Sequence, residues 1–373
     1  MFPMKIETMV LRHLRMPLVA PFETSFGRIQ ERDCILITLQ AGGLTGYGEC
    51  VADRSPGYSY ETCGTAWHIL KDFIAPTLFG SALDSAGDFQ ARVAAIRGHH
   101  LAKAGVEMAI WDLIGKANGE SLSELLGGVR TRVAVGVSVG IQPTVKALVE
   151  TVGRFIESGY RRVKIKIKPG RDAADTAAVR GAFPDLALQV DANSAYTLET
   201  AGALQPLDEL GLLLIEQPLA EDDLWDHRLL QEKFATAICL DESVTSARHA
   251  RQAIEMKACR IINIKPARLG GLLEGVAVHD LCRRYGMPVW CGGMLETGVG
   301  RASNLALASL ENFSLPGDIS ASERYFDRDI TVQRFELNPD STIDVPGGPG
   351  LGVEVDAEAV ESFCIRTLSL PER

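Results

Sequence analysis

The stretch VKIKIKPG, residues 163–170, decides how the chain folds, because it places three lysines on alternate positions of an apolar run. Successive side chains of a β-strand point to opposite faces, so Lys164, Lys166 and Lys168 would project the same way, about 7 Å apart in neighbouring pairs. The whole chain carries a net charge of −10, so this row of cations is a local feature. We therefore expect it to serve the chemistry of one site.

Short apolar runs like this one recur from about residue 131, and each is followed by a segment of helical pattern. The runs are VAVGVSVG, VKIKI, LALQV, LLLI, AICL, IINI and PVWC. Seven strand-helix units predict a parallel sheet, and that many units close most naturally into a (β/α) barrel of the TIM type. An open doubly wound sheet is the main alternative. The chain has no GxGxxG after an early strand and no GxxxxGK[ST], so dinucleotide and P-loop sites gain no support.

Residues 1–128 are organised differently, and we expect an α+β domain there. Residues 33–50 have the pattern of a hairpin, whereas 60–78, 84–97 and the run VEMAIWDLIGKA have the pattern of helices. The barrel would span 129–325. Beyond it the periodicity fades, and we expect residues 326–373 to return and cover the first domain.

Composition excludes several classes of protein. The chain is 46% hydrophobic and 23% charged, as in a large soluble globular protein, and no apolar run is long enough for a membrane helix. The N-terminus lacks the layout of a signal peptide, and the eight cysteines are scattered without a CxxC pair, so we expect free thiols and a cytoplasmic location. The acidic balance argues against nucleic-acid binding.

Ionisable residues follow the ends of successive predicted strands at a nearly constant interval. Lys166, Asp191, Glu216, Asp241 and Lys265 are 25, 25, 25 and 24 residues apart, which is one strand-helix unit each time. In a parallel barrel, residues at the same phase of successive units gather at the C-terminal mouth, where barrel active sites are built. We therefore expect the two lysines to flank three carboxylates at one opening.

Three carboxylates without His or Cys suit a hard cation, so the sequence predicts Mg²⁺ here, with Mn²⁺ or another divalent ion able to substitute. Each motif also has an ordinary explanation: DAN as an Asx turn, DES as a helix N-cap, EQP as a turn and alternating lysines as a solvated edge strand. Glu242 could replace Asp241 as the ligand, although the interval favours Asp241. Five in-phase positions favour a site over independent decorations.

The lysines suggest acid-base chemistry. A lysine with its ordinary pKa of about 10.4 is a poor base at neutral pH, and a second ammonium nearby can lower that pKa. We expect Lys164 to act in this way on Lys166 and also to contact an anionic substrate. With Lys265 opposite, the arrangement suits removal of a proton α to a metal-bound carboxylate.

These residues resemble the enolase superfamily over nearly the whole chain. The motifs are AKAGVEMAIWDLIGKANGESLSELLGG, KIKIKPG, VDANSAYTL, IEQPL, LDESV, NIKPARLGG and CGGMLETGVGRASN, in family order. The resemblance implies a modified (β/α)7β barrel under an N-terminal capping domain, Mg²⁺ on the three carboxylates, and Lys166 with Lys265 as the acid/base pair. It also implies Asn193 and Glu296 as supporting groups outside the ligand set.

The branch of the family follows from two departures. PVWCGGMLE has no histidine base, so the chain is similar to the muconate-lactonising subgroup. In PGDIS, Asp318 is followed by Ile319 and Ser320, so the DxD that binds a substrate ammonium in dipeptide epimerases is incomplete, which disfavours a free α-amino substrate. With PARLGG and FETSFG, the motifs are most similar to the o-succinylbenzoate synthase / N-acylamino acid racemase group.

That resemblance implies syn dehydration of 2-succinyl-6-hydroxy-2,4-cyclohexadiene-1-carboxylate to o-succinylbenzoate, a step of menaquinone synthesis, through an enediolate. The alternative is a dedicated racemase of N-succinylamino acids that uses Lys166 and Lys265 in turn. Arg268 could lower the pKa of Lys265 and favour racemisation, or it could be a solvated or helix-capping arginine. A catalytically inert barrel with a binding role is the most distant alternative.

The expected substrate is a small carboxylate, with no nucleic-acid or membrane partner, and the resemblance implies a homo-oligomer. Phe22, Phe26 and Tyr58 are candidates for lid residues that close over an acyl arm. The remaining candidates for the pocket wall, by resemblance, are Ser138, Gly292, Gly293, Met294 and Asp318.

Overall fold

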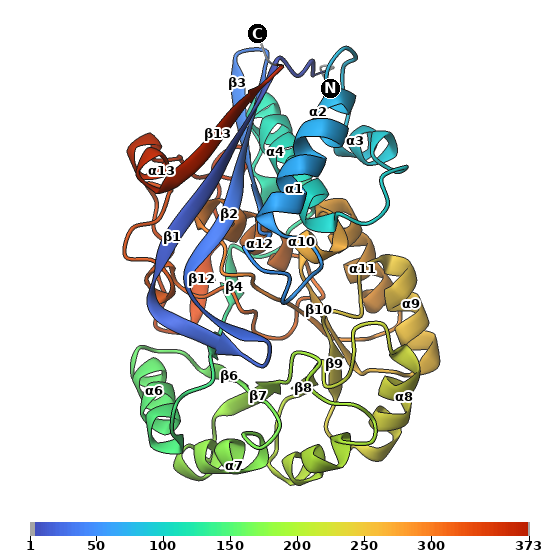
Figure 1. Ribbon diagram of the computed structural model, residues 1–373, viewed down its shortest axis with the longest axis vertical. Coiled ribbons are helices and arrows are strands. Elements are labelled where there is room, and N and C mark those ends of the chain that lie inside the picture. The colour runs from blue at the N-terminus through green and yellow to red at the C-terminus, as the bar shows by residue number, and fades with distance from the viewer. Residues whose placement is uncertain (1–3, 372–373) are drawn as a thin grey trace.

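The computed structural model of the chain describes residues 4–371. A twisted sheet with its helices lies above a barrel whose strands are surrounded by further helices (Figure 1). We call the upper part the cap, defined as residues 4–128 together with strand β13.

The sheet of the cap is a three-stranded antiparallel meander with one added edge strand. Its order is β13-β1-β2-β3, so the last strand of the chain pairs with the first. Its strands are β1 (Thr8–Thr24), β2 (Gly27–Ala41), β3 (Leu44–Cys50) and β13 (Cys364–Leu370). The hairpin predicted for residues 33–50 is confirmed as β2 and β3.

Helices of the cap pack against one face of this sheet and enclose a hydrophobic core that is separate from the core of the barrel. They are α1 (Cys63–Ile69), the π-helical turn η1 (Leu70–Ile74), α2 (Ala75–Leu78), α3 (Ala86–Arg92), α4 (His100–Asn118) and α5 (Leu122–Leu126). Helix α4 lies so close to β3 that a Cβ on Gly48 would collide with the Gly105 carbonyl. Two glycines thus permit the contact between α4 and the sheet.

The barrel sheet has seven parallel strands in chain order, β5 to β11. They are β5 (Val137–Val139), β6 (Arg162–Lys166), β7 (Ala187–Asp191), β8 (Ile215–Glu216), β9 (Ile238–Leu240), β10 (Ile261–Ile264) and β11 (Val289–Cys291). Each overlaps one of the seven predicted apolar runs. Neighbours in space are neighbours in sequence, which excludes the doubly wound alternative because its strand order reverses.

Residues 315–318 close the ring between the first and last strands. The Asp318 amide donates to the Cys291 carbonyl (2.8 Å), and the Gly136 amide donates to the Gly317 carbonyl (2.8 Å). An eighth extended segment therefore bridges the two edges, as a (β/α)7β barrel requires. Asp318 enters the barrel interior as a result.

The connections run outside the barrel. They contain α6 (Val145–Glu157), α7 (Ala173–Ala182), the 3-10 helix η2 (Ala201–Glu209), α8 (Leu224–Lys233), α9 (Ala247–Met256), α10 (Pro266–Leu269), α11 (Leu272–Arg284), α12 (Gly298–Ala308) and η3 (Ser322–Arg324). Residues 132–134 form β4 (Arg132–Ala134), which pairs with β12 (Thr342–Asp344), and α13 (Ala357–Phe363) precedes the return to the cap. The crossover after β7 contains Pro206, which lacks an amide donor and disfavours an α-helix there.

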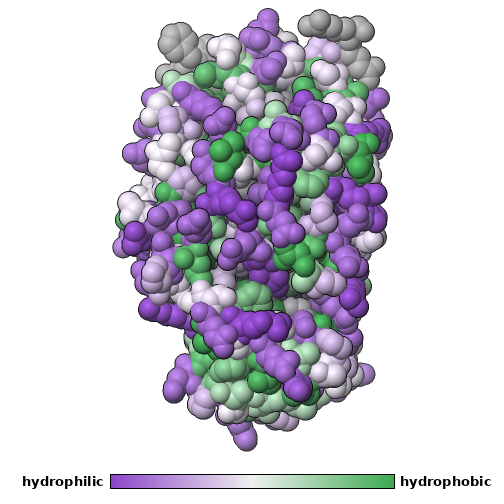
Figure 2. Space-filling model, turned by 90° about the vertical axis from the view of Figure 1, so that its left-hand side faces the viewer, coloured by the Kyte–Doolittle hydropathy of each residue, from purple (hydrophilic) through white to green (hydrophobic). Residues whose placement is uncertain are grey.

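The surface of the molecule is mainly polar, whereas its interior is mainly apolar. On the side that lies at the left of Figure 1, hydrophilic residues predominate and hydrophobic residues form small groups among them (Figure 2). Within residues 4–371, no helix is both long and apolar enough to cross a bilayer.

Candidate active site

Strand β6 aims a row of cations into the barrel. Arg162 and Lys164 are 1% and 2% exposed, and Lys166 ends the strand. The expectation for Lys168 was wrong: the chain turns after the strand, and the Lys168 ammonium pairs with Glu23 of β1 (3.1 Å). The inward row is therefore Arg162, Lys164 and Lys166, since residues two apart on a strand share a face.

The three carboxylates lie at the ends of the adjacent strands, and each of these residues is 0% exposed. Lys166 Nζ lies 2.6 Å from Asp191 Oδ2, and Lys164 Nζ lies 3.2 Å from Asp191 Oδ2 and 2.7 Å from Glu216 Oε2. Asp191 and Glu216 are direct neighbours in the register of β7 and β8. The two lysines of β6 thus hold the first two carboxylates.

Asp241 follows β9 and is bound from three directions. Lys265 Nζ lies 2.7 Å from Asp241 Oδ2, while the Arg268 guanidinium and the Tyr58 hydroxyl (2.9 Å) donate to Oδ1. Lys265 Nζ also lies 4.4 Å from the centre of the Tyr58 ring. Arg268 is 5% exposed and also donates to the Val244 carbonyl (2.7 Å), so it is a buried part of the site rather than a solvated arginine.

Burial and charge set the protonation of this cluster. Burial alone would raise the pKa of Asp191, but Lys166 and Lys164 bring it well below its usual range. Burial opposes a charge on Lys164, yet Asp318, Glu216 and Asp191 outweigh it and raise the pKa of this lysine. Lys164 is therefore held as a cation beside Lys166.

Two side chains beyond the strand ends complete the surroundings of Lys166. Asn193 Oδ1 accepts a hydrogen bond from Lys166 Nζ (2.8 Å), and Asn193 Nδ2 donates to Glu242 Oε1 (3.0 Å). Asn193 therefore orients the lysine. Glu242 lies at the mouth beside Asp241, but it is held by Asn193, whereas Asp241 is held by Lys265.

Glu296 has a different role from Asn193. Its carboxylate accepts from the Met294 amide (2.8 Å) and from Asn304 Nδ2 (2.8 Å), so it shapes the loop after β11. Gly292 in the same loop packs against Lys265, where an added Cβ would collide with Asn263 and with the lysine side chain.

The donor set fits a hard divalent ion. As the carboxylates stand, paired with ammonium groups, no three Asp, Glu, His or Cys side chains between residues 4 and 371 have the placement of a finished metal site. The chemistry is nevertheless suitable, because three buried carboxylates follow adjacent strands and are balanced only by cations. Two further buried oxygens, Glu242 Oε2 and Asn263 Oδ1, have no hydrogen-bond partner among the described residues. Unsatisfied oxygens of this kind suit a cation with bound water.

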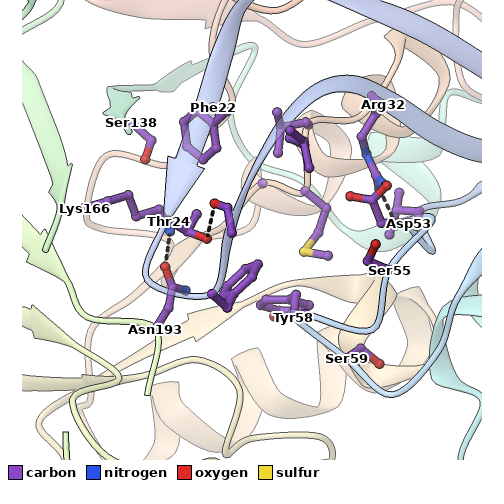
Figure 3. A pocket seen from close by; sticks show the side chains of 18 of the residues that line it. Phe22, Thr24, Arg32, Asp53, Ser55, Tyr58, Ser59, Ser138, Lys166 and Asn193 are labelled. Carbon is purple, nitrogen blue, oxygen red and sulfur yellow. Dashed lines mark hydrogen bonds and ion pairs between the residues drawn. The ribbon is translucent and has the colours of Figure 1, made fainter. Parts of the chain in front are cut away.

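A cavity of about 220 Å³ lies above this cluster, between the barrel mouth and the cap (Figure 3). The lid candidates Phe22, Phe26 and Tyr58 line it. From the barrel, Ser138, Gly293, Met294 and Asp318 also line it, as do all three site lysines and Asn193. Gly292 is not among the lining residues, since it lies behind Lys265.

Asp318 has both oxygens engaged by cations. Its Oδ1 accepts from Arg162 (2.5 Å) and its Oδ2 lies 2.6 Å from Lys164 Nζ. A substrate ammonium would have to compete with these two partners. The site therefore lacks a free acidic group at this position, in agreement with the incomplete DxD.

Comparison with known families follows this geometry. Residues 147–360 match the family model described as "Enolase C-terminal domain-like", and residues 5–127 match the N-terminal domain of mandelate racemase / muconate lactonizing enzyme. This chain belongs to the enolase superfamily. The superfamily generally depends on a divalent metal, which agrees with the carboxylate set.

Its superfamily relatives cover almost its whole length. It is 52% identical to the o-succinylbenzoate synthase of Geobacillus kaustophilus over 96% of each chain. It is 49% identical to the N-succinylamino acid racemase of Thermus thermophilus over 96% of this chain and 97% of that one. Among solved structures, an enolase superfamily member from Listeria innocua superposes with a TM-score of 0.94, with 40% identity over 98% of this chain and 99% of that one.

Sequence reasoning missed several residues of this candidate site. Arg162 is two positions before Lys164 in RRVKIK, so the strand period could have found it. Asn263 donates to Glu216 Oε1 (2.7 Å) and is likewise two positions before Lys265. Arg32 of the cap also lines the cavity, but no periodic signal connects it to the barrel.

Proposed function

We propose that this chain is a divalent-metal-dependent o-succinylbenzoate synthase. The observation that carries the proposal is that Lys166 and Lys265, which follow strands on either side of the three that precede the buried carboxylates, both line one cavity. The names of the relatives at 46–52% identity support the same reaction. The substrate would be 2-succinyl-6-hydroxy-2,4-cyclohexadiene-1-carboxylate.

Lys166 would act as the base. As a neutral amine, oriented by Asn193, it takes the proton from the carbon α to the substrate carboxylate, and the electron pair moves onto the carboxylate as an enediolate. Lys265 stays an ammonium and stabilises the negative charge that develops on these oxygens. Syn elimination breaks both bonds on one face, so protonated Lys166 is placed to protonate the hydroxyl, which leaves as water.

Asp191, Glu216 and Asp241 would hold the ion, which we propose to be Mg²⁺, with Mn²⁺ or another divalent ion able to substitute. When bound, a divalent ion supplies positive charge that favours the enediolate over the starting carboxylate. Lys164, held as a cation by Asp318, adds a fixed positive charge beside the carboxylates and would contact the substrate anion.

Racemisation of N-succinylamino acids is the second candidate. It is favoured by one observation: Lys166 and Lys265 both line the cavity, from strands separated by the three carboxylates. Each could then exchange a proton with one face of the α carbon. Relatives named N-succinylamino acid racemase at 48% and 49% identity support this activity beside dehydration.

A side-by-side rate comparison tests both candidates. Purified protein with Mg²⁺ is assayed for dehydration and, in D₂O, for α-proton exchange of N-succinylamino acids. Faster dehydration supports the synthase, and faster exchange makes racemisation the main activity. Absence of both would leave the inert barrel with a binding role.

The same resemblance implies a place in menaquinone synthesis, a cytoplasmic location and a homo-oligomeric state. These stay predictions. Size-exclusion chromatography with light scattering would test the last one.

A further inference from the structure

The cavity has cations on two opposite walls. Lys166 and the other site lysines belong to the barrel wall, whereas Arg32 of β2 belongs to the cap wall. Figure 3 shows Arg32 and Asp53 on one side of the cavity and Lys166 and Ser138 on the other. The lysines are engaged by carboxylates of the barrel, but the arginine lies outside that network.

Arg32 is a buried cation with spare donor capacity. The residue is 2% exposed, its Nη2 donates to the Val51 carbonyl, and its Nη1 lies 3.4 Å from Asp53 Oδ1, a long contact for an ion pair. Its Nε has no hydrogen-bond partner among the described residues. A buried unsatisfied donor is costly, which makes the guanidinium a ready partner for an anion.

Apolar side chains separate the two cationic walls. Phe22 and Ile29 come from the cap strands, and Met294 comes from the loop after β11. A ligand that is complementary to these walls has one carboxylate near the barrel lysines, an apolar middle and a second carboxylate near Arg32. Both candidate substrates have this form, because each carries a succinyl arm.

We propose that Arg32 binds the distal carboxylate of the succinyl arm and so selects a dicarboxylate over a ligand with a neutral arm. The inference rests on the proposed function for the identity of the arm, but it holds equally for dehydration and racemisation. Binding of the carboxylate to Arg32 would break no strong ion pair, because the contact between Arg32 and Asp53 is long and the Asp53 side chain is 30% exposed.

Arg28 is the natural control. It lies on the same strand four residues earlier, so both arginines are on the same face, and it also lines the cavity. Unlike Arg32 it is exposed, and its charge is screened by solvent. Replacing it should therefore have little effect on which arm is preferred.

The experiment compares two ligands by calorimetry with Mg²⁺ present: o-succinylbenzoate, and 2-butanoylbenzoate, in which a methyl group replaces the distal carboxylate. Wild type should bind o-succinylbenzoate about 10- to 100-fold more tightly, as expected for a charge-assisted hydrogen bond. Arg32→Met should lose most of this preference, whereas Arg28→Met should keep it. Wild type without a preference would overturn the proposal.

Two further outcomes separate binding from structure. If Arg32→Met weakens the binding of both ligands equally, Arg32 only supports the loop that contains Val51 and Asp53, and the proposal fails. If that variant does not fold, Asp53→Asn replaces it: freeing the guanidinium should strengthen binding of o-succinylbenzoate alone, and an unchanged preference refutes the idea. The calorimetric measurement requires no turnover. Selective binding of o-succinylbenzoate without dehydration or proton exchange would therefore refute the proposed function but still support the role of Arg32.

Discussion

Two groups of buried carboxylates in this molecule differ in what stabilises them. At the barrel mouth, Asp191 and its neighbours are paired with ammonium groups, which hold the pKa of Asp191 low. Between cap and barrel, burial raises the pKa of Glu49 and of Glu107 to about 7. Ammonium groups therefore keep Asp191 ionised despite its burial. Glu49 and Glu107 lack such partners and are partly protonated near pH 7, and burial beside Asp191 also raises the pKa of Glu216.

The interface glutamates cap helices of the barrel. Glu49 of β3 accepts from the Thr297 hydroxyl (2.6 Å) and the Gly300 amide (3.0 Å) at the start of α12. Glu107 of α4 accepts from the Leu273 amide (2.9 Å) at the start of α11. Helix N-termini offer only partial positive charge, so they cannot offset burial as lysines do. The cap is thus docked through two carboxyl groups that are partly protonated near pH 7.

The largest expected effect is at the mouth. Lys166→Ala should lower kcat for dehydration and for α-proton exchange by at least about 10²- to 10⁴-fold, because the base is removed. Lys168→Ala is the matched control, since its side chain pairs with Glu23 outside the barrel and should leave kcat within about twofold. Steady-state kinetics measure both. A Lys166→Ala enzyme with most of its turnover would refute the assignment.

Removal of one carboxylate should break the balance of charge. Asp191→Asn leaves the Lys166 ammonium without its closest partner, and we expect a loss of about 3 kcal/mol of unfolding free energy in the absence of metal. Divalent-ion binding and activity should be lost as well. Urea denaturation and calorimetry with Mg²⁺ test this, and Asp340→Asn on the surface is the control. Undiminished ion binding would exclude Asp191 as a ligand.

The stability contributed by the cap–barrel interface should fall as pH rises, whereas the stability contributed by an ion pair of a carboxylate falls as pH is lowered. With a folded pKa of about 7 above the ordinary 4.5, Glu107 favours the folded state below pH 4.5, and this contribution is lost as pH rises towards 7. Its size is of the order of 3 kcal/mol. Glu107→Gln should remove this part of the slope, as measured by urea unfolding at pH 5 and pH 8.

A companion variant separates charge from hydrogen bonding. Glu107→Ala leaves the Leu273 amide unsatisfied at both pH values and should cost about 1–3 kcal/mol more than Glu107→Gln. Equal stability of the two variants would mean that the cap–barrel contact does not depend on this acceptor.

The smallest effect is expected where the two regions meet. Tyr58→Phe keeps the ring beside Lys265 but removes the hydroxyl that donates to Asp241, which should cost about 1 kcal/mol in kcat/KM, or roughly fivefold. Phe26→Leu, which changes the lid without touching Asp241, is the control for packing. Identical losses in both variants would indicate that the hydroxyl contributes nothing specific.

The site was predictable where chain order matches spatial order. Lys166, Asp191, Glu216, Asp241 and Lys265 follow consecutive strands at one interval, so a parallel barrel must bring them to one mouth. The alternation of side chains along one strand failed for Lys168, because β6 ends two residues earlier and the Lys168 side chain pairs with Glu23 of the cap. Periodicity holds only while the strand lasts.

The sequence by itself determined the barrel, its closed order and the five residues that surround the mouth, because these depend on a repeat with a period that can be counted. Only the tertiary structure decided the partners of Glu49, Glu107, Arg32 and Arg162. Their contacts join segments up to about 250 residues apart, as Glu49 and Thr297 do, and no local pattern encodes such a contact. Burial then sets their protonation, since the loss of water is a property of the packed molecule and not of the chain.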